Sequence, residues 1–194
     1  MALLRCAQPY RVLRASTWEP DSAQDALRGA NPLGQIPVLQ LDDGSVMTES
    51  AAILIHLGLT FPASGLLPAD PVTRAQALRG LVFIAANCYP AIGVIDYPER
   101  WCAGGSAAEH ERLRLGARAR LHCCWEIFAD EFSTAQDFLG GASPAALDLL
   151  AAVVSRWAGA RAHLQTHRPA FSELLLRVES HPDLASVCAR HWLV

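Results

Sequence analysis

The chain has 194 residues and a mass of 20.9 kDa, with 52% apolar residues, 18% charged residues and a net charge of −3. This length can bury a core in one large domain or two small ones, and the small net charge gives no reason to expect nucleic acid or an anionic membrane as a main partner. All 16 basic residues are arginine, which excludes lysine chemistry such as a P-loop.

The six cysteines show no C-x-x-C spacing, so we interpret them as reduced and mostly buried thiols of a cytoplasmic protein. The run His122, Cys123 and Cys124 is not expected to bind a metal, because adjacent helical residues point about 100° apart. Arg5 and Arg11 interrupt the apolar N-terminus, which argues against a signal peptide. No membrane span is expected, because no apolar run approaches the roughly 20 residues that cross a bilayer.

The first 30 residues are predicted to form the end of a helix, a strand and a short second helix. β-type residues between Tyr10 and Leu13 indicate the strand. Residues 21–30 are predicted to be helical, with Asp21 as the N-cap and an end near Gly29.

Residues 36–47 are predicted to form a hairpin. The apolar run IPVLQL, residues 36–41, is typical of a buried strand, and SVM, residues 45–47, would be the return strand. Asp43 and Gly44 between them favour a two-residue turn, since both tolerate the positive φ angles that such a turn requires. Pro37 lies at the start of the first strand, where the missing backbone donor is tolerated.

A helix is predicted to begin directly after this hairpin. Thr48, Glu49 and Ser50 offer the chemistry of a helix start. The helix that follows is predicted to bury one face, made by Ile53, Leu54 and Leu57.

A stretch rich in proline and glycine marks the best domain boundary in the chain. We therefore predict a domain at residues 1–61, a linker at 62–71 and a second, all-helical domain at 72–194. The helix that begins near Val72 is predicted to break near Pro90 and Gly93. Its predicted buried face consists of Leu78, Leu81, Val82, Ala85 and Tyr89.

The loop after this helix combines aromatic and charged residues, namely Asp96, Tyr97, Glu99, Arg100 and Trp101. Two interpretations remain open. The loop could line an apolar substrate pocket with a few polar groups, or it could be a helix connection fixed by Trp101.

The rest of the chain is predicted to be helical. A long charged helix over residues 107–137 would turn Leu121, Trp125 and Phe128 inward, and two short helices are predicted at roughly 169–179 and 182–191. Between them, a central helix follows Pro144, with Ser143 available as its cap. Its predicted apolar face consists of Leu147, Leu150, Ala151, Val154 and Trp157.

The proline at a strand start and the Glu-Ser pair at a helix start are each ordinary features on their own. Together with the preceding NPLGQ, they closely resemble the glutathione-binding half of the glutathione transferase family. The resemblance implies a cis peptide bond before Pro37 and places the backbone of Ile36 against the cysteinyl part of glutathione. It also implies that Glu49 and Ser50 receive the γ-glutamyl end and that Gln35 lies near the glycyl carboxylate.

Two later segments are similar to the same family. GLLPADP, residues 65–71, resembles its connector between domains, and the helix after Pro144 resembles its core helix, which begins with a Ser/Thr-x-x-Asp capping box. Asp148 matches the acidic residue of the box, but Ala145 replaces the Ser or Thr. The cap has therefore either moved to Ser143 or been lost, and Asp148 is interpreted as structural.

The resemblance implies a thioredoxin-like α/β domain without its first strand and most of its first helix, followed by an all-helical bundle. The family's catalytic Tyr, Ser or Cys would then lie upstream of Met1, so the catalytic residue is unknown, and Cys6 is interpreted as a packing residue. Three hypotheses for the missing strand remain open. An upstream start was missed, the strands on either side of the gap pair directly, or another chain supplies the strand.

The leading functional prediction is glutathione binding with transfer of its thiolate to a small electrophile, as a homodimer and with no metal or cofactor beyond glutathione as co-substrate. A non-catalytic relative that binds glutathione weakly, or serves as an interaction module, is the alternative. Glutathione-dependent isomerisation, reduction and ether cleavage also remain open.

Overall fold

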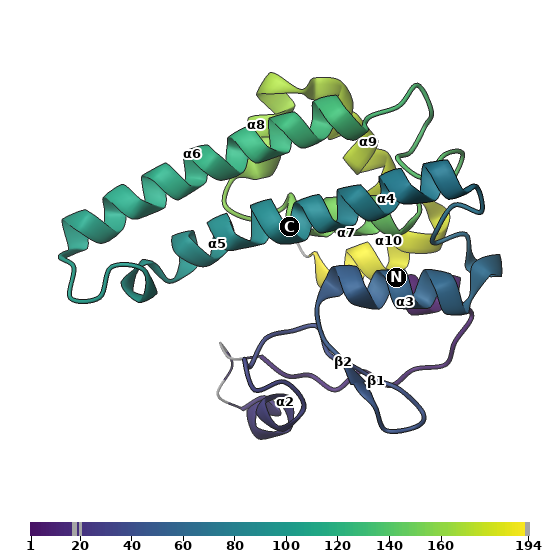
Figure 1. Ribbon diagram of the computed structural model, residues 1–194, viewed down its shortest axis with the longest axis horizontal. Helices are drawn as coiled ribbons and strands as arrows, with labels where there is room; N and C mark the ends of the chain where they lie inside the picture. The colour runs from purple at the N-terminus through teal and green to yellow at the C-terminus, as the bar shows by residue number, and fades with distance from the viewer. Residues whose placement is uncertain (17–18, 20, 193–194) are drawn as a thin grey trace.

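The computed structural model describes residues 1–16, 19 and 21–192. Its N-terminal part combines short helices with one hairpin, and its C-terminal part is helical (Figure 1). The N-terminal elements are α1 (Ala2–Arg5), α2 (Gln24–Ala30), β1 (Leu39–Gln40), β2 (Val46–Met47) and α3 (Ser50–Thr60). The C-terminal elements are α4 (Pro71–Phe83), α5 (Tyr89–Asp96), α6 (Ala107–Phe132), α7 (Ala146–Val154), α8 (Ala160–His167), α9 (Pro169–Ser180) and α10 (Pro182–His191).

The predicted hairpin is present, with shorter strands and a longer turn than expected. β1 and β2 pair antiparallel, with Leu39 opposite Met47. The next pair is Leu41 and Ser45, whose N–H and C=O groups lie 2.9 Å apart, so the loop holds three residues. Of these three, Gly44 alone has a positive φ, +84°. The predicted two-residue turn is wrong, because three residues separate Leu41 from Ser45, and the last of them, Gly44, is left-handed.

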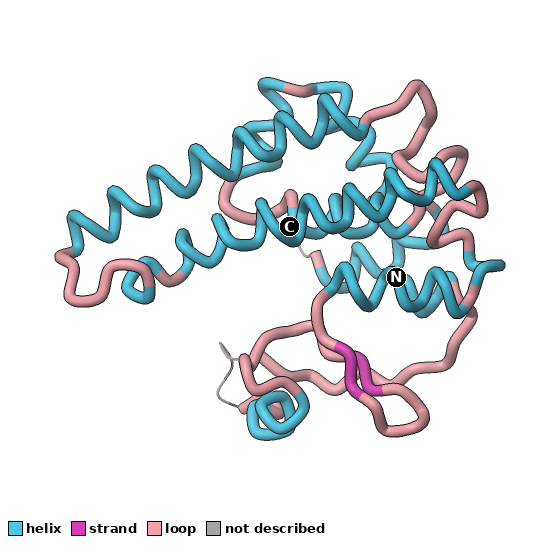
Figure 2. The backbone as a smooth tube through the Cα atoms, in the orientation of Figure 1, coloured by secondary structure: helices cyan, strands magenta, loops and turns pink. Residues whose placement is uncertain are grey.

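The predicted strand between Tyr10 and Leu13 is wrong. This segment has no strand pairing, and Val12 is 70% exposed. Figure 2 shows strand only in the hairpin. A strand exists only where a neighbour accepts and donates its backbone hydrogen bonds, and among the described residues the one ladder joins β1 to β2, besides an isolated bridge between Phe138 and Gly141. Direct pairing across the expected gap is therefore also not found in this part of the chain.

The helices of the N-terminal part agree with most of the predictions. α2 begins at Gln24 behind Ala23, so the predicted cap, Asp21, lies outside it, while its end at Ala30 matches the expectation. Cys6 is buried in the core after α1, which confirms its packing role. In α3 the predicted face is buried, and it packs against α7 and α4.

α4 and α5 form one continuous helical rod, and the predicted break near Pro90 is wrong. A π-helical turn (Ile84–Cys88) joins them, and the Tyr89 N–H donates to the Ile84 carbonyl five residues back. A proline inside an α-helix removes a donor and clashes with the preceding turn, and a wider π-turn directly before Pro90 absorbs this misfit. Val82 is 55% exposed, so it does not belong to the predicted buried face.

The rod, Pro71–Asp96, has 26 residues and contains an 18-residue window with a mean hydropathy of 1.6, so by length and composition alone it could cross a membrane. It is the one such helix among the described residues. No membrane span was expected from the sequence, because no uninterrupted apolar run approaches roughly 20 residues. Leu81, Ile84 and Cys88 on this rod are fully buried in the helical core, as expected of a core helix in a globular protein.

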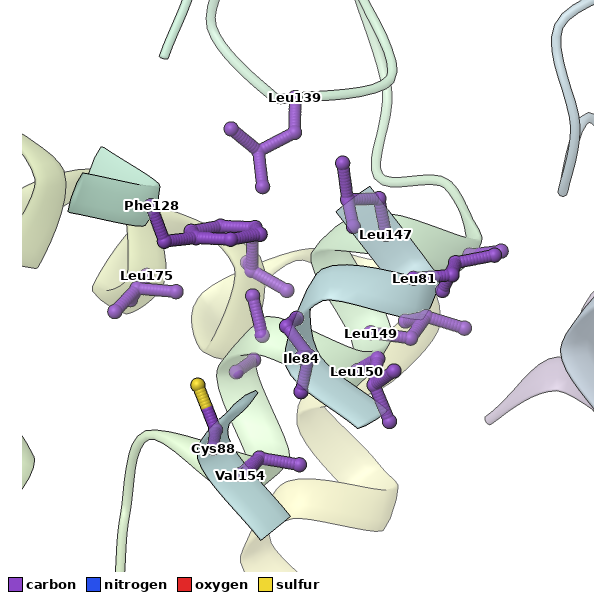
Figure 3. Close-up of a cluster of buried hydrophobic side chains, with 14 of the residues drawn as sticks. Leu81, Ile84, Cys88, Phe128, Leu139, Leu147, Leu149, Leu150, Val154 and Leu175 are labelled. Carbon is purple, nitrogen blue, oxygen red and sulfur yellow. The ribbon is translucent and has the colours of Figure 1, made fainter. Parts of the chain in front are cut away.

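The helical core is built mainly from α4, α6, α7 and α9 (Figure 3). Leu121, Trp125 and Phe128 of α6 are fully buried as predicted, although α6 ends at Phe132 and not at residue 137. α9 and α10 match the two short predicted helices, whereas α8 was not predicted. Trp157 follows the end of α7 and is 41% exposed, so its predicted place on the buried face is wrong.

Asp148 has the structural role that sequence analysis assigned to it. Its side chain is fully buried and accepts hydrogen bonds from the N–H groups of Leu139 (2.7 Å), Gly140 (2.9 Å) and Ala145 (2.9 Å). The N-cap of α7 is Ala145, which offers no side-chain acceptor, and Ser143 does not replace it. Of the two hydrogen bonds of a capping box, only the one from the N-cap N–H to the Asp148 carboxylate is therefore present.

Candidate functional site

The hairpin brings together the two segments predicted to bind glutathione. Gln35, Ile36 and Pro37 precede β1, while Glu49 and Ser50 follow β2. Since Leu39 pairs with Met47 in an antiparallel register, continuing that register by two residues sets Pro37 across from Glu49. The fold thus holds both halves of the candidate site at one end of the hairpin.

The first half is a loop with a cis peptide bond between Ile36 and Pro37, as the family resemblance implies. Asn31 fixes the shape of this loop. It is 4% exposed, its Nδ2 donates to the Gln35 carbonyl at 2.8 Å, and its Oδ1 accepts from the Leu33 N–H at 3.1 Å. Ile36 itself is 63% exposed.

The second half is the N-terminus of α3. Glu49 is its N-cap and has a φ of +66°, an uncommon conformation for a residue with a side chain. Such backbone outliers cost about 1–3 kcal/mol and cluster at binding and catalytic sites. The first hydrogen bond of the helix runs from the Ile53 N–H to the Glu49 carbonyl, which leaves the N–H groups of residues 50–52 without an intrahelical partner. These groups and the helix dipole favour a carboxylate at this end.

Tyr89, the first residue of α5, reaches this site from the helical part of the chain. Its hydroxyl oxygen lies 3.3 Å from Ser50 Oγ, within hydrogen-bond distance. Its ring contacts the Trp157 ring edge-on, with centroids 5.8 Å apart. Burial raises the pKa of Tyr89, and the nearby Glu49 charge acts in the same direction, while the contact with Ser50 opposes them. Tyr89 therefore keeps its proton at neutral pH.

The loop at residues 96–101 follows the end of α5 opposite to Tyr89. Trp101 is largely exposed and lines a small cavity of about 300 Å³ between α5 and α6, together with Pro90, Val94 and Arg120. The Arg100 guanidinium lies over the Tyr97 ring, 3.8 Å from its centroid. The exposure of Trp101 argues against the interpretation that it fixes the connection.

A second and larger cavity, of about 670 Å³, lies between α9 and α10 and is lined by Leu176, Cys188 and Trp192 among others. In the part of the chain that the structure describes, no group of three or more His, Cys, Asp or Glu side chains could hold a metal ion.

Sequence reasoning missed two residues of the candidate site. The Asn31-Pro32 pair carried a weak signal, because Asn before a turn often bonds to the backbone two residues on. Tyr89 carried none, since its spacing along α4 and α5 indicated only a buried helical face, and its contact with Ser50 spans 39 residues.

Comparisons with known proteins agree with this geometry. Residues 1–59 match the family model described as the glutathione S-transferase N-terminal domain. The chain is 28% identical over 190 residues to the uncharacterised GST-like protein YncG of Escherichia coli, an alignment that covers 96% of this chain and 88% of YncG. It is also 32% identical over 117 residues to maleylacetoacetate isomerase of Rhizobium meliloti, covering 59% and 54% of the two chains.

A solved structure with the same fold is a glutathione transferase homologue from Sulfitobacter with bound glutathione. The TM-score is 0.82 at 20% identity, and the match covers 99% of this chain and 91% of that one. The predicted fold class is confirmed, namely a thioredoxin-like N-terminal domain with an all-helical C-terminal domain. Residues 1–59 thus match the N-terminal domain of the glutathione S-transferase family, and the chain as a whole is similar to a GST-like protein and shares the fold of a glutathione transferase homologue.

Proposed function

We propose that this protein binds glutathione and transfers its thiolate to a small electrophile. The observation that carries the proposal is the pairing of the cis loop at Ile36-Pro37 with the N-terminus of α3 across one hairpin. An extended peptide can bond to the loop backbone while an anionic end occupies the helix terminus. In this arrangement Ile36 pairs with the cysteinyl backbone and Gln35 lies near the glycyl carboxylate.

The γ-glutamyl end of glutathione carries both an ammonium and a carboxylate, and the second half of the site offers a partner for each. The Glu49 carboxylate pairs with the ammonium, and Ser50 with the free N–H groups of α3 binds the carboxylate. Glutathione is the co-substrate in this proposal, and no metal or other cofactor takes part. The protein group that stabilises the thiolate is not assigned to any residue of this chain.

A second reaction class is favoured by the similarity to maleylacetoacetate isomerase of Rhizobium meliloti. In that reading glutathione adds to an unsaturated acid and is released again after isomerisation. The same binding site serves both reactions, so the choice rests on the acceptor and not on Gln35, Ile36, Pro37, Glu49 or Ser50.

Calorimetric titration with glutathione tests binding, and a conjugation assay with a chlorinated dinitrobenzene tests transfer. We expect Glu49→Gln and Ser50→Ala each to weaken binding about tenfold or more, because each removes a contact to a charged group. Glu99→Gln and Ser180→Ala, which change the same residue types on other elements, should bind as the wild type does.

Three outcomes separate the candidates. Turnover of maleylacetoacetate without conjugation would favour the isomerase, and binding without either reaction would favour a non-catalytic glutathione-binding protein. No binding at all would contradict every form of the proposal.

We also propose a homodimer, as the family resemblance implies. Val72 and Val82 expose large apolar side chains on α4, which is consistent with a face that a second copy covers. Light scattering should give twice the chain mass of 20.9 kDa. A mass of one chain at micromolar concentration would contradict it.

A further inference from the structure

The contact between Ser50 and Tyr89 joins the candidate glutathione site to the helical domain. The two hydroxyl oxygens lie 3.3 Å apart, and either group can donate. Tyr89 is held in place from behind by the Trp157 ring. The site therefore contains a polar side chain from α5 that no part of the proposed binding mode uses.

A bound carboxylate decides the direction of this hydrogen bond. A serine hydroxyl has one proton, and a carboxylate only accepts hydrogen bonds. Ser50 must therefore donate its single hydrogen bond to the carboxylate of the ligand. Ser50 Oγ can then only accept a second bond, and the Tyr89 hydroxyl becomes its donor. Two hydrogen bonds in line, from Tyr89 to Ser50 to the carboxylate, polarise and strengthen each other.

The protonation state of Tyr89 suits this role. Burial raises the pKa of Tyr89, and the negative charge of Glu49 opposes a second charge beside it. The hydroxyl is thus a neutral donor over the whole physiological pH range. The ring keeps its position through packing against Trp157, independently of the hydroxyl.

We propose that Tyr89 is a positioning residue of the glutathione site, whose hydroxyl donates to Ser50 and orients the Ser50 proton toward the γ-glutamyl carboxylate. This inference rests on the proposed function and deepens it. It also makes the site a joint product of both domains, because Ser50 belongs to α3 and Tyr89 to α5.

A double-mutant cycle tests the proposal by calorimetric titration of glutathione into the wild type, Ser50→Ala, Tyr89→Phe and the double variant. We expect Tyr89→Phe to weaken binding about 3- to 10-fold in the wild-type background. In the Ser50→Ala background the same change should alter affinity by no more than about twofold, because its partner is gone. Tyr10→Phe is the matched control, and it should bind as the wild type does.

A change in the ligand tests the same hydrogen-bond chain, by removing the carboxylate that Ser50 is proposed to bind. An analogue of glutathione without the α-carboxylate of its γ-glutamyl residue should bind equally well to the wild type and to Tyr89→Phe. A purely structural effect of the substitution would instead weaken both ligands alike. Phenylalanine keeps the ring against Trp157, and the unfolding temperature of each variant checks that packing is retained.

The outcomes distinguish this inference from the proposed function. Unchanged glutathione affinity in Tyr89→Phe, or an equal loss with Ser50→Ala present, would overturn the role of Tyr89 and leave glutathione binding intact. A wild type that does not bind glutathione would overturn both.

Discussion

Asn31 shows how a single buried side chain can shape a binding loop from outside it. Its amide donates to one backbone group of the loop and accepts from another, and both bonded groups, on Gln35 and Leu33, lie within four residues of Pro37. The side chain does not need to touch a ligand to matter. It acts by holding the carbonyl of Gln35 and the backbone that follows in one conformation.

We predict that Asn31→Ala weakens glutathione binding about 3- to 10-fold and lowers the free energy of unfolding by about 1–2 kcal/mol, because two backbone groups lose their partner. Titration calorimetry and urea denaturation measure the two effects. Asn87→Ala is the control, since it removes a similar amide bond, to the Phe83 carbonyl, on the α4–α5 rod. An equal loss of affinity in both variants would show that the effect is not local to the loop.

Asp148 gives a second prediction at this scale. Its carboxylate accepts from three backbone N–H groups in a fully buried position, and an amide in Asp148→Asn turns a donor toward at least one of them. We expect the free energy of unfolding to fall by roughly 1–3 kcal/mol, the usual cost of an unsatisfied buried group. Urea denaturation measures it. Asp137→Asn, at an exposed position nearby, should change stability little, and a similar loss there would contradict the argument.

Burial also raises the pKa of Asp148, while the three N–H groups oppose this shift. A carboxyl group with a raised pKa in the folded state favours folding most when it is protonated. Its contribution therefore declines as the pH rises above the ordinary value of 3.8. The free energy of unfolding of the wild type, measured relative to that of Asp148→Asn, should therefore decrease between pH 4 and pH 7.

At the scale of elements, α6, α8 and α9 are tied together by a polar network on their outer side. Glu126 of α6 contacts His163 of α8 at 2.7 Å and Arg168, at the start of α9, at 3.2 Å. Arg168 also forms two hydrogen bonds with Asp130, at 2.7 and 2.8 Å. One turn of α6 thus orients both of the helices that follow α7.

The pH dependence of this network has a definite sign. The hydrogen bond from His163 holds the pKa of Glu126 below its ordinary value of 4.5, with Arg168 acting in the same direction. A lowered pKa in the folded state means that stability is present above pH 4.5 and is lost as the pH falls through the folded value. The wild type should therefore lose its advantage over Glu126→Gln between about pH 5 and pH 3. Thermal unfolding of both proteins across this range measures it, and a stability difference that stays constant with pH would contradict the argument.

The elements also show what a sequence can and cannot predict. The inward face of α6, at Leu121, Trp125 and Phe128, follows from helical spacing alone, and that prediction is confirmed. The strand near Tyr10 could not be judged, because a strand depends on a neighbour that local composition does not report. Pro90 indicated a break, since nothing in the composition distinguishes a broken helix from one that continues through a π-turn.

The candidate site also has a part that the sequence predicts and a part that it does not. The cis bond at Ile36-Pro37 and the start of α3 at Ser50 follow from a short motif that is contiguous in sequence. Tyr89 enters through the packing of the helical domain against α3, which is a property of the whole fold. Contacts between distant segments were therefore the part of the site that sequence analysis could not supply.

On the scale of the whole molecule, α3 is the element that joins the two domains. It begins at the candidate site and packs against α7 and α4. In the segment that follows it, Leu66 and Leu67 are buried, and the Leu66 carbonyl accepts a hydrogen bond from the Ala146 N–H at 2.9 Å, where α7 begins. Packing at the C-terminal end of α3 thus helps to fix the position of the whole helix, and with it that of Ser50 at its N-terminus.

Gly58 lies where this packing is tightest. A Cβ atom at this position would lie 2.5 Å from Leu67 Cγ and 3.2 Å from its Cβ, so the Leu67 side chain and its packing against α3 would have to shift. We expect Gly58→Ala to lower the free energy of unfolding by about 1–3 kcal/mol, the usual cost of overpacking. Gly93→Ala is the matched control, because Gly93 is also helical and a Cβ there would meet no atom within 4 Å.

Alanine is the better helix former by up to about 1 kcal/mol, so Gly93→Ala should be neutral or stabilising. Urea denaturation of both variants gives the comparison. If Gly58→Ala were stabilised as much as Gly93→Ala, the connection after α3 would be free to move, and the two domains would not be joined as tightly as this packing implies. With the expected loss, glutathione affinity should fall as well, because α3 carries Ser50 and can shift only as a unit.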